Sequence, residues 1–102
     1  MRLIYEGAKS SIEMEVRRER GTGPIILSNP QYRIVDAARA LITGFDWAVA
    51  DWDDETNIIS AMFDSSVTGI TAVGKYYMQF RATIGAERYE WEVTVQVREW
   101  GP

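Results

Sequence analysis

The residues best suited to chemistry lie in one acidic run, which consists of Asp51, Asp53, Asp54 and Glu55. Calcium binds several carboxylate oxygens supplied by a loop, so Asp51, Asp53 and Glu55 are the candidate ligands of a metal ion. The run departs from a helix–loop–helix calcium loop, because Thr56 stands at the glycine position and no glutamate closes the loop. We therefore favour a solvated charged turn over a metal site.

Catalytic residue types are scarce, because the sequence contains no histidine and no cysteine. Histidine is the commonest general base near neutral pH, and cysteine supplies thiolate nucleophiles, thiolate metal ligands and disulfides. The serines have only Lys9 and Lys75 as potential activating bases, and neither lysine lies in a supporting motif. The glycines of segment 21–24 precede an apolar run, so they do not form a phosphate-binding loop. We therefore expect no enzymatic activity, no catalytic residue and no cofactor.

Two groups of residues could form a contact surface for another protein. Trp52, beside the acidic run, and Trp100, near the end, are expected to be exposed, and tryptophan is enriched at interface hot spots. Arg17, Arg18 and Arg20 form a basic cluster that could contact phosphates, although a solvated turn is the favoured interpretation.

Composition and charge narrow the class of protein. The chain has 102 residues, which fits a single domain over 1–102, and we expect loose order at 1–10 and 99–102. Its apolar fraction of 46% and aromatic fraction of 12% are typical of a folded protein. The formal net charge of −4 argues against nucleic acid as a partner. No apolar run approaches the ~18–20 residues of a membrane span, and the start lacks signal-peptide form, so we expect a cytoplasmic product without a membrane partner.

The clearest local structure is a C-terminal β-hairpin. Apolar and polar residues alternate with period two in segments 76–84 and 88–98, and the pair Gly85-Ala86 between them suits a type II′ turn. That turn places Phe80 opposite Trp91, so apolar residues meet across the two strands. The same register pairs Ala82 with Tyr89, Met78 with Val93, Tyr76 with Val95 and Arg81 with Glu90.

The same alternation predicts further short strands upstream. They cover residues 11–19, 25–27, 31–36, 45–50 and 56–63, and turn signals such as Ser28-Asn29-Pro30 separate them. We therefore predict an all-β fold, an antiparallel sandwich of about seven strands, with a small barrel as the alternative.

Two upstream segments carry particular predictions. The alternation in 45–50 places Trp47 in the core, and the alternation of the hairpin places Trp91 there as well. The segment 36–43 is ambiguous, because Asp36 could cap a short helix or could begin a turn that leads into another strand. The strand is slightly favoured there, because the surrounding chain is strand-like.

Gly74-Lys75-Tyr76, ahead of an alternating strand and a closing hairpin, resembles the end of immunoglobulin-like sandwiches. In that fold a tyrosine near the start of the penultimate strand bonds back to the preceding loop, the tyrosine corner. With segment 32–36 and Gly44, the order of features resembles small immunoglobulin-like domains of tailed-bacteriophage and prophage tail or baseplate proteins.

The resemblance implies a structural role in assembly. We therefore expect a non-enzymatic module that binds other protein subunits, with self-association as one form of such contacts and a phage particle as the destination. The alternative is a carbohydrate- or ligand-binding sandwich, assisted by calcium, that uses Trp52 or Trp100 with the nearby acids.

Overall fold

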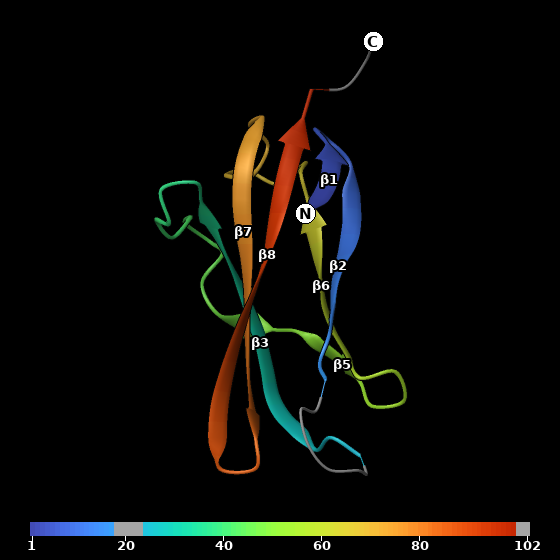
Figure 1. Ribbon diagram of the computed structural model, residues 1–102. Helices are drawn as coiled ribbons and strands as arrows, with labels where there is room; N and C mark the ends of the chain where they lie inside the picture. Colours follow the sequence, from blue (N-terminus) through green and yellow to red (C-terminus); the bar gives the residue numbers. More distant parts are fainter. Residues whose placement is uncertain (18–23, 100–102) are drawn as a thin grey trace.

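The structure is a computed structural model that describes residues 1–17 and 24–99. All regular secondary structure in these residues is β-strand, arranged in two sheets (Figure 1). The strands are β1 (Arg2–Tyr5), β2 (Lys9–Glu15), β3 (Leu27–Asp36), β4 (Ala48–Val49), β5 (Asp51–Asp53), β6 (Ile58–Asp64), β7 (Gly74–Ile84) and β8 (Glu87–Arg98). The predicted all-β class is confirmed, and the described residues include no helix that could cross a membrane.

The two sheets enclose a single hydrophobic core. The larger sheet has the strand order β1-β8-β7-β3-β4, and the smaller sheet has the order β2-β6-β5. Fully buried side chains come from both layers: Ile12, Ile59 and Phe63 from the smaller sheet, and Ile34, Met78, Phe80, Val95 and Val97 from the larger. Because each sheet contributes one apolar face to a common core, the architecture is a β-sandwich.

The C-terminal hairpin has the predicted register. β7 and β8 pair without a shift from Gly74 opposite Val97 to Ile84 opposite Glu87, and Phe80 lies opposite Trp91 as expected. The connecting Gly85 has a positive φ of 64° and Ala86 does not, as a type II′ turn requires. Local alternation and turn chemistry were therefore sufficient to define this part of the fold.

The sheet is mixed, so the prediction of an entirely antiparallel sandwich is wrong. β1 pairs with β8 in parallel, with Arg2 opposite Val95 and Tyr5 opposite Arg98. This strand falls within residues 1–10, for which the sequence indicated loose order. Parallel strands need a long connection, and here the connection is nearly the whole chain, so no local pattern announces the pairing.

The segment after β3 forms turns and no helix. Asp36 Oδ1 accepts hydrogen bonds from the backbone N–H groups of Ala38 and Ala40, both at 2.9 Å. Arg39 has a φ of 64°, which is incompatible with a right-handed helix. Leu41 then forms an isolated bridge to Val35. The capping tendency of Asp36 is therefore used to close a turn.

The turn signal at Ser28-Asn29-Pro30 marks a β-bulge inside β3. The register of β3 against β7 shifts between Ser28 and Gln31, where Asn29 has a φ of 52°. The strand continues on both sides of the irregularity, so the predicted break is wrong. A bulge accommodates an extra residue without ending the strand, which explains why turn-forming residues occur within it.

Tyr76 makes the hydrogen bond expected of it. Its hydroxyl donates to the carbonyl oxygen of Ala72, in the preceding loop, at 2.8 Å. Burial raises the pKa of this hydroxyl, and the nearby charge of Asp36 adds to the effect. The bond joins the loop to the start of β7.

Candidate functional site

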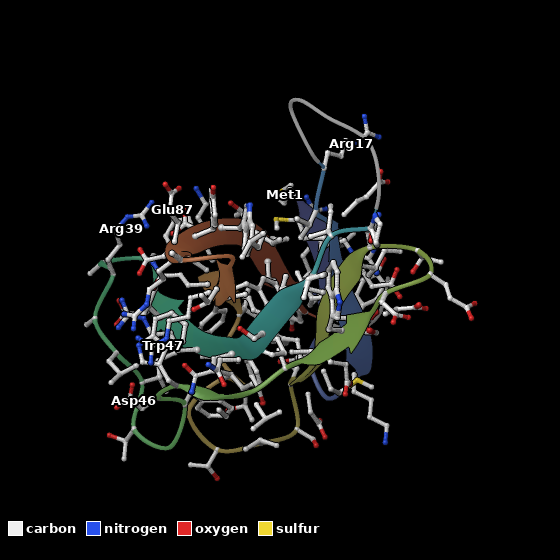
Figure 2. All side chains as sticks on the ribbon, turned by 90° about the horizontal axis from the view of Figure 1, so that it is seen from below. Met1, Arg17, Arg39, Asp46, Trp47 and Glu87 are labelled. Atoms are coloured by element: carbon white, nitrogen blue, oxygen red, sulfur yellow. The ribbon has the colours of Figure 1, made fainter. Side chains whose placement is uncertain are left out.

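The outward face of the larger sheet carries the most developed polar structure in the described part of the chain. On β3 and β7, Ile34 and Phe80 point into the core, and the residues that alternate with them point outward. Arg33 and Arg81 are among these outward residues. The segment between β3 and β4 lies along this face, and Figure 2 shows its residues Arg39 and Trp47 on the same side of the molecule.

The indole ring of Trp47 contacts two arginines. The guanidinium carbon of Arg81 lies 3.9 Å from the ring centroid, and that of Arg33 lies 4.6 Å from it. Both distances are within the range of a favourable cation–π interaction, which contributes about 0.5–1 kcal/mol at exposed sites. We refer to Trp47, Arg33 and Arg81 as the tryptophan–arginine cluster.

Two glutamines hold the arginines of the cluster. Arg33 Nε donates to Gln79 Oε1 at 2.7 Å, and Arg81 Nε donates to Gln31 Oε1 at 2.8 Å. Within the described residues these bonds use only Nε, so the terminal nitrogens of both guanidinium groups remain for acceptors on another molecule. The side chains are thus ordered before any partner arrives, which lowers the entropic cost of binding.

A second contact ties the same segment to the sheet. Arg39 lies over the ring of Tyr77 at 4.2 Å, and both its terminal nitrogens bond the Glu92 carboxylate, one of them (Nη2 to Oε2) at 3.1 Å. Gln79 Nε2 also donates to Glu92 Oε1, at 3.0 Å. The hydrogen bond from Arg39 holds the pKa of Glu92 below its ordinary value, and that from Gln79 adds to the effect. Because the pair is exposed, its contribution to stability is small and salt-dependent.

Two shallow hollows flank the cluster, and each contains one of its arginines. One has a volume of about 360 Å³ and is lined by Arg81 together with Arg88 and Val49. The other has a volume of about 250 Å³ and is lined by Arg33 and Trp47. These volumes are at or below the low end of those usual for ligand pockets. Each hollow therefore suits a side chain of a partner better than a large ligand.

The acidic run lies elsewhere and has a local role. Asp53 Oδ1 accepts hydrogen bonds from the backbone N–H groups of Glu55, at 2.9 Å, and Thr56, at 3.3 Å. These bonds hold the pKa of Asp53 below its ordinary value. Asp51 is an exposed residue of β5, and no three acidic side chains of the described residues converge closely enough to hold a metal ion. The run therefore spans β5 and the turn after it.

Of the predicted contact residues, the structure describes Trp52 and Arg17. Trp52 was expected to be exposed, but it is half-buried and packs against the core, because alternation along β5 turns Asp51 and Asp53 outward and Trp52 inward. Arg17 is exposed and pairs with Glu15 at 2.9 Å, and Figure 2 shows it away from Trp47. Arg18, Arg20 and Trp100 lie outside the described residues.

Sequence reasoning missed Trp47. A strand over 45–50 would have placed it in the core, but only Ala48–Val49 are strand there, Val49 is 81% exposed and Ala50 is buried. The chain leaves the larger sheet between β4 and β5, so alternation does not continue through the segment. Trp91 was correctly placed, since it packs half-buried against the core. One signal could have indicated the position of Trp47. The outward residues of β3 and β7 include arginines and glutamines, and arginines on a sheet surface commonly contact aromatic or acidic side chains.

Comparisons with known proteins provide no relative. No family model, no curated protein and no solved structure matches the chain. The function is therefore inferred from the residues of this chain and their arrangement alone.

Proposed function

We propose that the chain is an immunoglobulin-like sandwich that acts as a non-enzymatic assembly module of a tailed-phage or prophage particle. It binds other protein subunits through the outward face of its larger sheet. The absence of histidine and cysteine from the sequence supports a role without catalysis.

Two features support the immunoglobulin-like assignment. The strand order β8-β7-β3-β4 corresponds to G, F, C and C′ of such sandwiches, and β2-β6-β5 corresponds to B, E and D. The bond from Tyr76 to Ala72 has the position of a tyrosine corner.

The tryptophan–arginine cluster is the observation that carries the contact function. Tryptophan and arginine are the residue types most enriched at hot spots, and here both arginines are held in place by glutamines and by the indole ring. A partner side chain with a carboxylate would reach the terminal nitrogens of Arg81 in the larger hollow. The binding energy would come from charge-assisted hydrogen bonds.

The alternative, a carbohydrate- or ligand-binding module, used Trp52 or Trp100 with the nearby acids. Trp52 packs against the core, which weakens its part in such a site, and Trp100 lies outside the described residues. The cluster around Trp47 does not supply a replacement platform, because arginines lie against its ring.

Site-specific photocrosslinking in the natural host tests the proposal. A photoreactive phenylalanine at Val49, which is 81% exposed beside Arg81, should form a discrete adduct with another particle protein. The same residue at Val67, which is 42% exposed in the loop after β6, is the matched control and should form none. Equal adducts from both positions, or none from either, would contradict the proposal. Neighbouring genes that encode no tail or capsid protein would remove the phage assignment.

A further inference from the structure

The edges of the two sheets differ in how they are protected. β4 has two residues, β5 three and β1 four, so each offers little backbone for pairing. β2 is longer, but Arg2 Nη2 donates to the backbone oxygen of Ser11 at 3.2 Å and to Ser10 Oγ at 3.5 Å. Short length and covering side chains are common ways of preventing strand addition.

β8 has a long edge without such protection. β1 pairs only with Val95–Arg98, and no strand of the described residues pairs with Glu87–Thr94 on the side away from β7. Figure 1 shows this lower part of β8 with an open side opposite β7. The stretch contains no proline and no lysine, and its register with β7 has no bulge. It is therefore suited to accept another strand.

The hairpin register shows which backbone groups are free. Glu87 follows a two-residue turn and pairs with Ile84, so its N–H and C=O face β7. The backbone groups of even-numbered residues then point away from β7. The bond from Glu6 N–H to Arg98 O, at 2.8 Å on the β1 side, agrees with this parity. Arg88, Glu90, Glu92 and Thr94 therefore offer backbone donors and acceptors to a neighbour.

We propose that a second copy of this chain pairs along this edge, β8 antiparallel to β8, so that the two larger sheets become continuous. The inference rests on the proposed function as a protein-contact module and names one of its contacts. Charge complementarity supports a copy of the same chain as the occupant. With Tyr89 opposite its counterpart, Arg88 of each copy lies opposite Glu90 of the other, and no like charges face each other.

Other registers are less favourable. A shift of two residues pairs Arg88 with Glu92 but places Glu90 opposite Glu90, and a further shift of two places Glu90 opposite Glu92 and leaves Arg88 opposite Thr94. Within the described residues, Arg88 and Glu90 make no ion pair in the single chain, so both are available. Because the paired stretch is short, the dimer is weak and forms at high concentration.

Sedimentation equilibrium of the full chain over a wide concentration range tests the proposal. The wild-type protein should show a monomer–dimer equilibrium, and Arg88→Glu should raise the dissociation constant by about tenfold or more, because two attractive pairs become repulsive. Glu90→Arg should weaken the dimer similarly. The double variant R88E/E90R should restore it, since the pairs form again with reversed charges. Arg17→Glu makes the same charge change at an exposed position after β2, away from Glu87 in Figure 2; it is the control and should leave the equilibrium unchanged.

Results that contradict the self-pairing can be told apart from results that contradict the proposed function. A strict monomer at every concentration would overturn the self-pairing and leave the Val49 crosslink as a separate question. A dimer that R88E does not weaken would overturn this edge as the interface, and a dimer that R88E/E90R does not restore would overturn the register with Tyr89 opposite its counterpart. A photocrosslinker at Arg88 that captures only a different protein would show that another strand occupies the edge. Circular dichroism of each variant checks that the sandwich is intact.

Discussion

The β7–β8 hairpin and the segment 37–53 differ in what determines their structure. Along β7 and from Trp91 to Val97 of β8, burial follows the alternation of the sequence, while Glu87–Glu90 next to the turn are all exposed. The turn sets the pairing of both strands. In the segment 37–53, the chain forms turns, a two-residue strand and then a strand of the other sheet. Trp47 and Arg39 in this segment are positioned by side chains of β3, β7 and β8. Local patterning therefore sets the strands of the hairpin, whereas contacts between distant residues set the position of the segment 37–53.

The largest expected effect comes from the hairpin core. Phe80 is fully buried, so Phe80→Ala should lower the free energy of unfolding by about 3–5 kcal/mol through lost burial and a cavity. Denaturant unfolding followed by tryptophan fluorescence measures the change. Val49→Ala, at an 81% exposed position, is the control and should change stability little. A small effect at Phe80 would contradict a single core shared by both sheets.

A smaller effect is expected at the hairpin turn. Gly85 has a φ of 64°, and a Cβ added there would meet no other atom within 4 Å. Gly85→Ala should therefore cost about 1–2 kcal/mol for its backbone conformation alone, and thermal unfolding measures this loss. Ala86→Gly, at the neighbouring turn position, should cost less, because its φ is not positive. If the two substitutions had equal effects, the type II′ assignment would be wrong.

The next prediction concerns the segment 37–53, through Trp47 of the tryptophan–arginine cluster. Trp47→Ala should lower stability by about 1 kcal/mol, because two cation–π contacts of a half-buried ring are lost. It should also reduce the yield of the Val49 crosslink, whereas Trp47→Phe, which keeps an aromatic face, should retain more of both. Loss of stability without any loss of crosslinking would assign the cluster a structural role only.

The smallest effect concerns pH. The folded-state pKa of Glu92 is lowered by its hydrogen bond from Arg39, so its contribution to stability is complete above the ordinary glutamate pKa of about 4.3. That contribution is lost as the pH falls through the lower folded-state value. Wild type should therefore unfold at a higher temperature than Glu92→Gln at neutral pH, and the difference should disappear in acid. A constant difference at all pH values would rule out the Arg39–Glu92 pair as its source.

Much of the fold could be predicted because its determinants are close in sequence. Alternation identified β7 and β8, most of β2 and β6, and the second half of β3. It misread Ser28-Asn29-Pro30, since a bulge and a chain reversal use the same residue types. It also left the choice at residues 36–43 open, because the side chain of Asp36 can cap a helix or close a turn.

The candidate site was predicted much less well. Trp52 and Trp47 exchanged roles: the one expected to be exposed packs against the core, and the one expected in the core contacts outward arginines. The cause is the crossing from β4 to β5, where Ala50 is buried and its N–H donates to the carbonyl oxygen of Pro30 at 2.9 Å. A crossing between sheets changes which face is inward, so alternation cannot be carried through it.

The residue types and their spacing were enough to define the β class and the hairpin with its register, which depend on period-two burial and on contacts between near neighbours. The bond from Tyr76 to the preceding loop was expected from the resemblance to immunoglobulin-like sandwiches. The meeting of distant segments set the parallel pairing of β1 with β8 and the contacts of Trp47 with Arg33 and Arg81. It also left two thirds of β8 without a neighbour beyond β7 among the described strands. Such features depend on segments far apart in the chain, and their meeting is set by how the two sheets close around the core.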